Sequence, residues 1–341
     1  MVSETIKQRI IRWGGRGLRS TPLSWMVRGF FRRRANIIFY HAVWPANDKR
    51  AKLFGGMDLD QFARDLKILS RRFQFVSLDT LLQGNKDADR PCLVVTFDDG
   101  FDLTAGGATD VMDELGVQAT VFVNTASVNY QQLMWQHRFS AIRHLRGDEV
   151  FIKQFNQLQD KLANKDRLNQ AGEQIYITHN WPMDKKDEYV DELWQSCNMP
   201  PMDDMLNEEH PYFDWDGLHK WIERGHNVGC HTHTHPFCSS LDDELIKNEL
   251  ISPATELKER LKLTTLSFAY PFGERLSPEH EQAIIKQGIF TCLLGTSDVF
   301  SLLDNDPNIM VRVEAEAGID QEVFGKAVIR AIKRNFSDST K

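Results

Sequence analysis

The sequence lacks several features that would place it outside ordinary globular proteins. Its 341 residues contain no apolar run of about 18 or more, so no membrane-spanning helix is predicted. Residues 1–20 lack the apolar core of a secretory signal, and we expect a cytoplasmic protein. The five cysteines are odd in number and form no C-x-x-C pair, which fits a reducing compartment.

Signatures of several enzyme and binding classes are also missing. There is no G-x-S-x-G elbow, no H-E-x-x-H helix and no phosphate-binding P-loop. Gly15-Arg16-Gly17 lacks the third glycine and the preceding strand of a dinucleotide site. A basic segment is present, but no nucleic-acid-binding module accompanies it, so we expect no nucleic-acid partner.

Positive charge is concentrated at the start of the chain. Residues 1–35 carry nine basic residues and one acidic residue, a net charge of +8; the whole chain is −7, so the remainder carries −15. Thr21 and Pro22 predict a helix start. A basic amphipathic arm of this kind fits two interpretations: peripheral binding to the inner face of an anionic membrane, or packing on the protein's own body. Its apolar side chains repeat with helical spacing at Leu23, Met26, Val27 and Phe30.

From residue 36 onward, strand and helix patterns alternate, which predicts βαβ units around a parallel sheet. A polar, mostly helical stretch at about 136–213 is interpreted as an insertion, so we predict one domain over residues 36–335. Expected strands are 36–41, 74–78, 92–97, 119–123, 227–231, 266–270, 288–293 and 309–313. Expected helices are 60–72, 77–82, 109–115, 215–224, 242–263 (interrupted at Pro253) and 321–334.

Two carboxylates stand directly after a strand of buried type, in Thr96-Phe97-Asp98-Asp99-Gly100. Adjacent side chains at a strand end point in different directions, so one carboxylate can hold a metal while the other faces a substrate. In α/β barrels, catalytic groups lie at these carboxyl ends. Asp-Asp-Gly is also a common solvated turn, and the segment alone leaves both interpretations open.

Three histidines follow a later strand, in Cys230-His231-Thr232-His233-Thr234-His235-Pro236. His231 and His235 are spaced i, i+4 and can converge on one ion from a helical turn, whereas His233 should point elsewhere. Imidazole nitrogens and carboxylate oxygens are usual zinc ligands. The alternative is a set of surface histidines. The Cys230 thiol is expected to point away from the metal and to be structural.

These two segments resemble the first two motifs of the polysaccharide deacetylase family, also called carbohydrate esterase family four or the chitooligosaccharide deacetylase homology domain. The resemblance covers about residues 36–330. It continues in order through the Tyr-His-x-Val opening (40–43), the strand at 119–123, the lead into the histidines (225–229) and the third motif (268–273).

The resemblance implies a distorted (β/α)7 barrel and a metal-dependent hydrolase that removes acetyl from an N-acetylated amino sugar. It implies Asp99, His231 and His235 as ligands of one divalent ion, Zn²⁺ before Co²⁺, Ni²⁺ or Mn²⁺, and Asp98 as catalytic base. Such an ion lowers the pKa of bound water and polarises the N-acetyl oxygen. A backbone N–H near Phe272 would stabilise the oxyanion.

Two departures from the family pattern concern the surroundings of Asp98. The third-motif arginine that orients the base is replaced by Ala269, and we expect Arg312 to take its place; the alternative is an ordinary salt bridge at the barrel rim. The late Leu-x-His motif that supplies the general acid is missing, since no histidine follows His280. His41 is our candidate acid, with a hydrogen-bonded structural histidine as the alternative.

Aromatic residues near the expected site are candidates for contact with a sugar, although core packing is the alternative for the two tryptophans. The missing export signal favours a substrate at the inner membrane face: a lipid-linked saccharide, or an intermediate of lipopolysaccharide or exopolysaccharide. Two other functions stay open, namely hydrolysis of another amide-like C–N bond (an N-formyl sugar or a ureide) and glycan binding by a decayed site. The aromatic candidates are Trp135, Trp215, Tyr270 and Phe272, whereas His137 and His210 are expected on the surface of the insertion.

Overall fold

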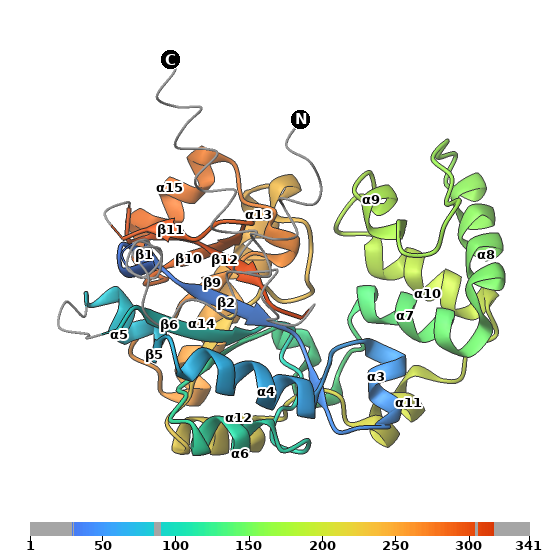
Figure 1. The fold of residues 1–341 in the computed structure, drawn as a ribbon. Coiled ribbons are helices and arrows are strands. Elements are labelled where there is room, and N and C mark those ends of the chain that lie inside the picture. The colour runs from blue at the N-terminus through green and yellow to red at the C-terminus, as the bar shows by residue number, and fades with distance from the viewer. Residues whose placement is uncertain (1–28, 30, 85–89, 304–305, 317–341) are drawn as a thin grey trace, which may run out of the picture.

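The computed structural model describes residues 29, 31–84, 90–303 and 306–316 (Figure 1). The helices expected at about 21–30 and at 321–334 lie outside this part of the chain, apart from Gly29 of the first. None of the described helices is both long and apolar enough to cross a membrane.

Seven parallel strands close into a barrel, which confirms the predicted fold class. β2 (Ile37–Tyr40) pairs with β6 (Cys92–Phe97) and so closes the ring, with Ile38 opposite Val95. β5 (Gln74–Phe75) runs beside the first residues of β6, with Gln74 opposite Cys92. The order around the ring is β2 (Ile37–Tyr40), β12 (Ile309–Glu314), β10 (Leu293–Thr296), β9 (Phe268–Ala269), β8 (Asn227–Cys230), β7 (Thr120–Val123) and β6 (Cys92–Phe97).

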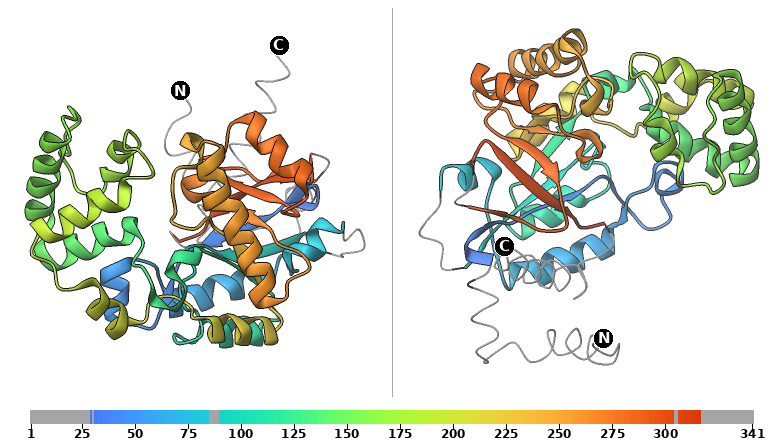
Figure 2. Two further views of the ribbon diagram at one scale, coloured as in Figure 1. Left: turned by 180° about the vertical axis from the view of Figure 1, so that it is seen from behind. Right: turned by 90° about the horizontal axis from the view of Figure 1, so that it is seen from above.

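Helices surround the barrel on its outer side (Figures 1 and 2). The sequence sets their starts: Asp58 accepts hydrogen bonds from N–H groups in the first turn of α4 (Leu59–Ser70), and Ser77 caps α5 (Leu78–Leu82) in the same way. Two short pairs of strands lie outside the barrel, β1 (Arg34–Ala35) with β11 (Ser301–Leu302), and β3 (Val43–Trp44) with β4 (Met57–Asp58). The outer helices include α4 (Leu59–Ser70), α5 (Leu78–Leu82), α6 (Ala108–Glu114), α12 (Trp215–Glu223), α13 (Asp243–Ile246), α14 (Ser252–Leu261) and α15 (Pro278–Gln287).

Two expected elements differ from the structure. The long helix expected at 242–263 is divided by a wide π turn, η3 (Lys247–Ile251), directly before Pro253, which lacks the N–H that a regular turn needs. The strand expected at 288–293 begins only at Leu293. Gly288 ends α15 with a φ of 64°, and Phe290 is buried in a loop against Phe268, so the apolar pattern there reflects burial and not strand pairing.

The segment interpreted as an insertion forms a lobe of helices beside the barrel (Figures 1 and 2). Its core contains Phe139, Phe155 and Trp181, with the rings of Phe155 and Trp181 stacked 5.8 Å apart. Helix α3 (Lys49–Phe54), from the start of the barrel, packs on α7 and connects the two parts. The lobe contains α7 (Trp135–Arg146), α8 (Asp148–Lys161), α9 (Gln174–Thr178), α10 (Lys186–Ser196) and α11 (Met202–Glu209).

Candidate metal centre and active site

The chain turns sharply where β6 ends, and this turn separates the two aspartates. The N–H of Asp98 still donates to the Tyr40 carbonyl at 2.9 Å, as a strand residue does. Asp99 and Gly100 then adopt φ values of 67° and 69°. A left-handed conformation costs a non-glycine residue about 1–3 kcal/mol and is typical of functional sites. Both carboxylates are buried, and they point to different neighbours.

The histidine segment follows β8 and folds back on itself. The expectation of a helical turn is wrong: Thr232 and His235 have φ values of 71° and 60°, and the Thr232 hydroxyl accepts the N–H of His235 at 3.0 Å. This closed loop still brings the rings of His231 and His235 within 4.9 Å of each other. Burial raises the pKa of Cys230 to about 12, as expected of a structural thiol.

The expected metal ligands converge at the carboxyl ends of β6 and β8. Oδ1 of Asp99 lies 3.4 Å from Nε2 of His231 and 3.1 Å from Nε2 of His235. One ligand atom from each residue lies within 4.8 Å of the others, and all three residues are buried. His231 donates from Nδ1 to the Ala269 carbonyl at 2.7 Å. Its other ring nitrogen, Nε2, then faces the Asp99 carboxylate and can offer a lone pair to a metal.

This donor set fits a divalent ion. Within the described residues, Oδ1 of Asp99 is buried without a hydrogen-bond partner. Burial raises the pKa of Asp99, but His235, His137 and His231 outweigh it and hold that pKa well below its usual range. Burial lowers the pKa of His235 to about 4. Carboxylate and neutral imidazole are the protonation states that bind metal, and two nitrogens with one oxygen suit zinc.

Asp98 forms a buried pair with Arg312 at the end of β12, as expected from the sequence. Nη1 and Nη2 of Arg312 lie 2.6 and 2.8 Å from Oδ1 and Oδ2 of Asp98. The guanidinium also lies over the rings of Phe39 and Phe122. Arg312 is fully buried, so the contact is not an exposed salt bridge at the rim. Burial raises the pKa of Asp98, but Arg312 outweighs this effect and the pKa is lowered.

His41 follows β2 and is held by Glu316. The Glu316 carboxylate accepts the N–H of His41 at 2.8 Å and lies 3.1 Å from its Nδ1. Burial lowers the pKa of His41, but Glu316, with weaker contributions from Asp99 and Asp98, raises it to about 10. A third of the side chain is exposed. His41 is therefore a cationic group that reaches the surface within the field of both aspartates.

His137 was expected on the surface, and this expectation is wrong. The side chain is buried, and its Nε2 lies 3.0 Å from Oδ2 of Asp99. His210, by contrast, is exposed as expected. The sequence contains no motif that would mark His137 as buried. The helix α7 is buried on more than one side, but the polar residues among its buried positions suggest an exposed face. Buried residues of α7 are Trp135, His137, Arg138, Phe139, Ala141 and Ile142.

Of the aromatic candidates, Phe272 remains available to a substrate. It is 37% exposed, and its ring lies edge-on to His235 at 4.6 Å. Trp135 and Tyr270 are buried and offer no free face to a sugar, so those two predictions are wrong. Trp135 donates to the His235 carbonyl at 2.8 Å, and Tyr270 donates to a buried carboxylate. Trp215 lies under the guanidinium of Arg260, on an outer helix.

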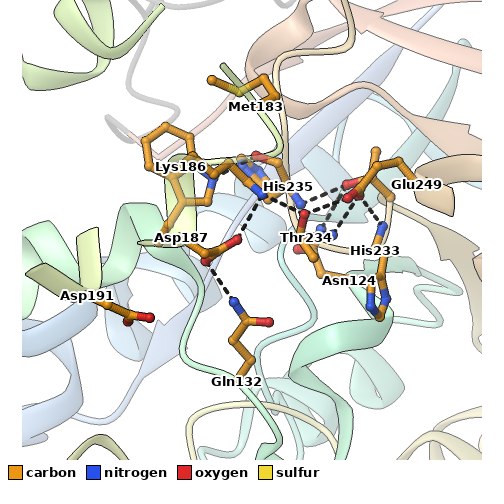
Figure 3. A network of polar contacts seen from close by, with 12 residues as sticks. Asn124, Gln132, Met183, Lys186, Asp187, Asp191, His233, Thr234, His235 and Glu249 are labelled. Carbon is orange, nitrogen blue, oxygen red and sulfur yellow. Dashed lines mark hydrogen bonds and ion pairs between the residues drawn. The ribbon is translucent and has the colours of Figure 1, made fainter. Parts of the chain in front are cut away.

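The lobe also supports the histidine loop through a polar network (Figure 3). The buried Lys186 of α10 donates to Thr234 Oγ1 at 2.6 Å and lies 2.9 Å from Asp187 Oδ2. Thr234 donates in turn to Glu249 Oε1 at 2.6 Å. The other oxygen of Glu249, in η3, accepts the N–H groups of His233 and Thr234. The loop is thus fixed from two sides.

Comparisons with known proteins identify solved structures of the same fold. No curated protein matches the sequence significantly. The solved deacetylase PplD of Streptococcus pyogenes, in complex with acetate, has a TM-score of 0.53 at 13% identity, over 86% of this chain and 97% of that one. IcaB from Ammonifex degensii has a TM-score of 0.53 at 18% identity, over 86% and 96%. BC0361, a polysaccharide deacetylase from Bacillus cereus, has a TM-score of 0.52 at 14% identity, over 86% and 68%.

At such identities these structures show a shared fold. The sequence itself matches the family described as "Polysaccharide deacetylase" over residues 85–289, more than half of the chain. The matched segment contains both aspartates and both ligand histidines. The chain belongs to the polysaccharide deacetylase family, whose members are hydrolases of amide bonds in acetylated glycans.

Proposed function

We propose that the protein removes the acetyl group from an N-acetylated amino sugar of a bacterial glycan. The supporting observation is the pair of aspartates: Asp99 joins two histidines in a buried N, N, O donor set, and Asp98 stands beside it, ionised. The divalent ion bound by that set would activate a water molecule and polarise the amide carbonyl.

Asp98 is suited to act as the general base. Arg312 binds both of its oxygens, which fixes the plane of the carboxylate and keeps it ionised. Each oxygen retains a second lone pair, so one of them can take the proton of the attacking water. The water oxygen bonds to the carbonyl carbon, the C–N bond then breaks, and acetate and the free amine leave.

His41 is the proposed general acid for the departing amine. Its contact with Glu316 through Nδ1 leaves Nε2 to deliver a proton. A pKa raised to about 10 keeps this proton in place at neutral pH. The amine needs a proton as the C–N bond breaks, and none of the family's late histidines is present in the chain.

Phe272 is the proposed wall of the acetyl pocket. Its backbone has a φ of 55°, and the two hydrogen bonds that close its turn come from the N–H groups of Gly273 and Glu274. We assign the N–H of Phe272 to the developing oxyanion and its exposed ring, beside His235, to the acetyl methyl group.

For the substrate, we favour a lipid-linked saccharide, or a lipopolysaccharide or exopolysaccharide intermediate, at the inner membrane face. The net charge of +8 in residues 1–35 supports attraction to anionic lipid. Arg33 is exposed, as is Arg32, whereas Arg34 is buried and donates to the Phe300 carbonyl at 2.7 Å. Changing Arg32 and Arg33 to Glu should reduce co-sedimentation with anionic vesicles; unchanged binding would exclude the membrane role.

The test of the function is release of acetate from lipid-linked and soluble N-acetylhexosamine glycans, with Zn²⁺ or Co²⁺ added. We expect turnover that Asp98→Asn abolishes and that the exposed-site control Asp184→Asn retains. Release of formate from an N-formyl sugar, or of ammonia from a ureide, would point to another C–N bond. Glycan binding without any turnover would indicate a decayed site.

A further inference from the structure

A buried chain of hydrogen bonds runs from helix α7 of the lobe to the metal-binding carboxylate. Nε2 of His137 lies 3.0 Å from Oδ2 of Asp99, and its Nδ1 lies 2.5 Å from the hydroxyl of Tyr212. That hydroxyl also accepts the N–H of Met134 at 3.3 Å. All four residues are at least 95% buried, so bulk water does not compete for these contacts.

The chemistry of the groups sets the direction of the bond between His137 and Asp99. The Asp99 carboxylate can only accept, so the Nε2 of His137 carries a hydrogen. The Tyr212 oxygen, which accepts from Met134, is the hydrogen-bond partner of the other ring nitrogen, Nδ1. The Nε2–H of His137 is therefore committed to one oxygen of Asp99.

This commitment makes the two oxygens of Asp99 unequal. Oδ2 is held by His137, whereas Oδ1 faces the Nε2 atoms of His231 and His235 and, among the described residues, has no hydrogen-bond donor. We propose that His137 is a positioning residue of the metal centre: it fixes the rotation of the Asp99 carboxylate so that one oxygen binds the ion. The proposal rests on the metal site of the proposed function and adds a residue from outside its motifs.

The imidazole of His137 is itself held by aromatic rings. The Phe101 ring lies 4.7 Å from it, and the Tyr212 ring lies 5.7 Å away, inclined to it by 30°. Phe54 of α3 closes a further side at 6.4 Å. Phe101 and Tyr212 also pair through their backbones, which ties the end of the lobe to the loop after β6. Rotation of His137 away from Asp99 would disturb all of these contacts.

The test is Zn²⁺ affinity, measured by competition with a chromophoric chelator, together with the absorption spectrum of the Co²⁺-loaded protein. His137→Leu should weaken Zn²⁺ binding by about 10–100-fold and change the Co²⁺ spectrum, because a ligand loses the hydrogen bond that orients it. His137→Gln, whose amide can donate to Oδ2, should recover part of the affinity. His144→Leu, at an exposed histidine on the same helix, should leave both readouts unchanged.

Tyr212→Phe keeps the ring packing and removes only the hydroxyl, so it decides the matter if His137→Leu does not fold. It should weaken Zn²⁺ binding and shift the Co²⁺ spectrum in the same sense as His137→Leu. Wild-type affinity and spectrum in folded His137→Leu or Tyr212→Phe would overturn the proposal, as would failure of His137→Gln to differ from His137→Leu. These readouts need no substrate: Zn²⁺ binding lost in Asp99→Ala, with no acetate released from any glycan, would refute the proposed function alone.

Discussion

Replacing Arg312 by Met tests the electrostatic support of the proposed base. Arg312 is fully buried and makes two charge-assisted hydrogen bonds, of 2.6 and 2.8 Å, to a carboxylate that is itself 3% exposed. Met fills most of the space but leaves Asp98 buried without its partner. Removing one partner of a buried ion pair costs about 3–5 kcal/mol, several times the value of an exposed pair. We expect a loss of this size in the free energy of unfolding at pH 7.

The pH dependence gives this prediction a sign. In the wild-type protein the pKa of Asp98 is lowered, so its ionised form adds stability above its usual pKa, and this contribution is lost as pH falls through the folded-state pKa. Without Arg312, burial dominates and the pKa of Asp98 rises. The deficit of Arg312→Met should therefore be largest at neutral pH and shrink on acidification. The acidic limb of the rate profile should move to higher pH.

The assay is urea denaturation of each variant from neutral to acidic pH. Wild type, Arg312→Met, Asp98→Asn and the double variant together form a double-mutant cycle. Asp98→Asn removes the buried charge, so the double variant should be more stable than the sum of the two single losses predicts. A loss under about 1 kcal/mol in Arg312→Met, as for an exposed ion pair, would refute this reasoning. A deficit that does not change with pH would also refute it.

Three further perturbations follow from the structure. Lys186→Met should weaken Zn²⁺ binding more than the adjacent, exposed control Lys185→Met, because of the two lysines only Lys186 contacts the histidine loop. Chelator competition measures the Zn²⁺ affinity of both variants, and equal affinities would contradict this prediction. His41→Gln should lower kcat. It should also remove the alkaline limb of the pH–rate profile, in which the wild-type rate falls as pH rises through about 10. An unchanged kcat and pH–rate profile would exclude the acid role. Gly100→Ala should cost about 1–3 kcal/mol in urea denaturation, because φ is 69° and the new Cβ would lie 3.1 Å from Val123; wild-type stability would show that the turn tolerates a side chain.

Much of the barrel could be predicted because its strands are short apolar runs between helical patterns. The exception at 288–293 is instructive. Phe290 is as buried as a strand residue, yet it belongs to a loop that packs on Phe268. Hydrophobic patterning reports burial, and only backbone pairing distinguishes a buried loop from a strand.

Three residues of the candidate site could be predicted from their place in the fold. Asp98, Asp99 and Arg312 stand at or near the carboxyl ends of parallel strands, where the topology of a barrel brings separate segments together. His137 has no such marker, since it reaches Asp99 from a helix of the lobe. Trp135 was misassigned because a large aromatic residue serves a core as readily as a sugar, and sequence alone does not show which face it presents.

The contacts from the lobe limit how freely this enzyme can be recombined with its relatives. His137 touches Asp99 and Lys186 touches the histidine loop, so the lobe and the barrel share the metal centre. A chimera that exchanges residues 136–213 for those of a homologue would keep every family motif and still lose the support of its ligands. An exchanged lobe would need matching residues at positions 137 and 186 to restore these contacts. The lobe is for this reason a structural part of the metal centre and not a transferable module.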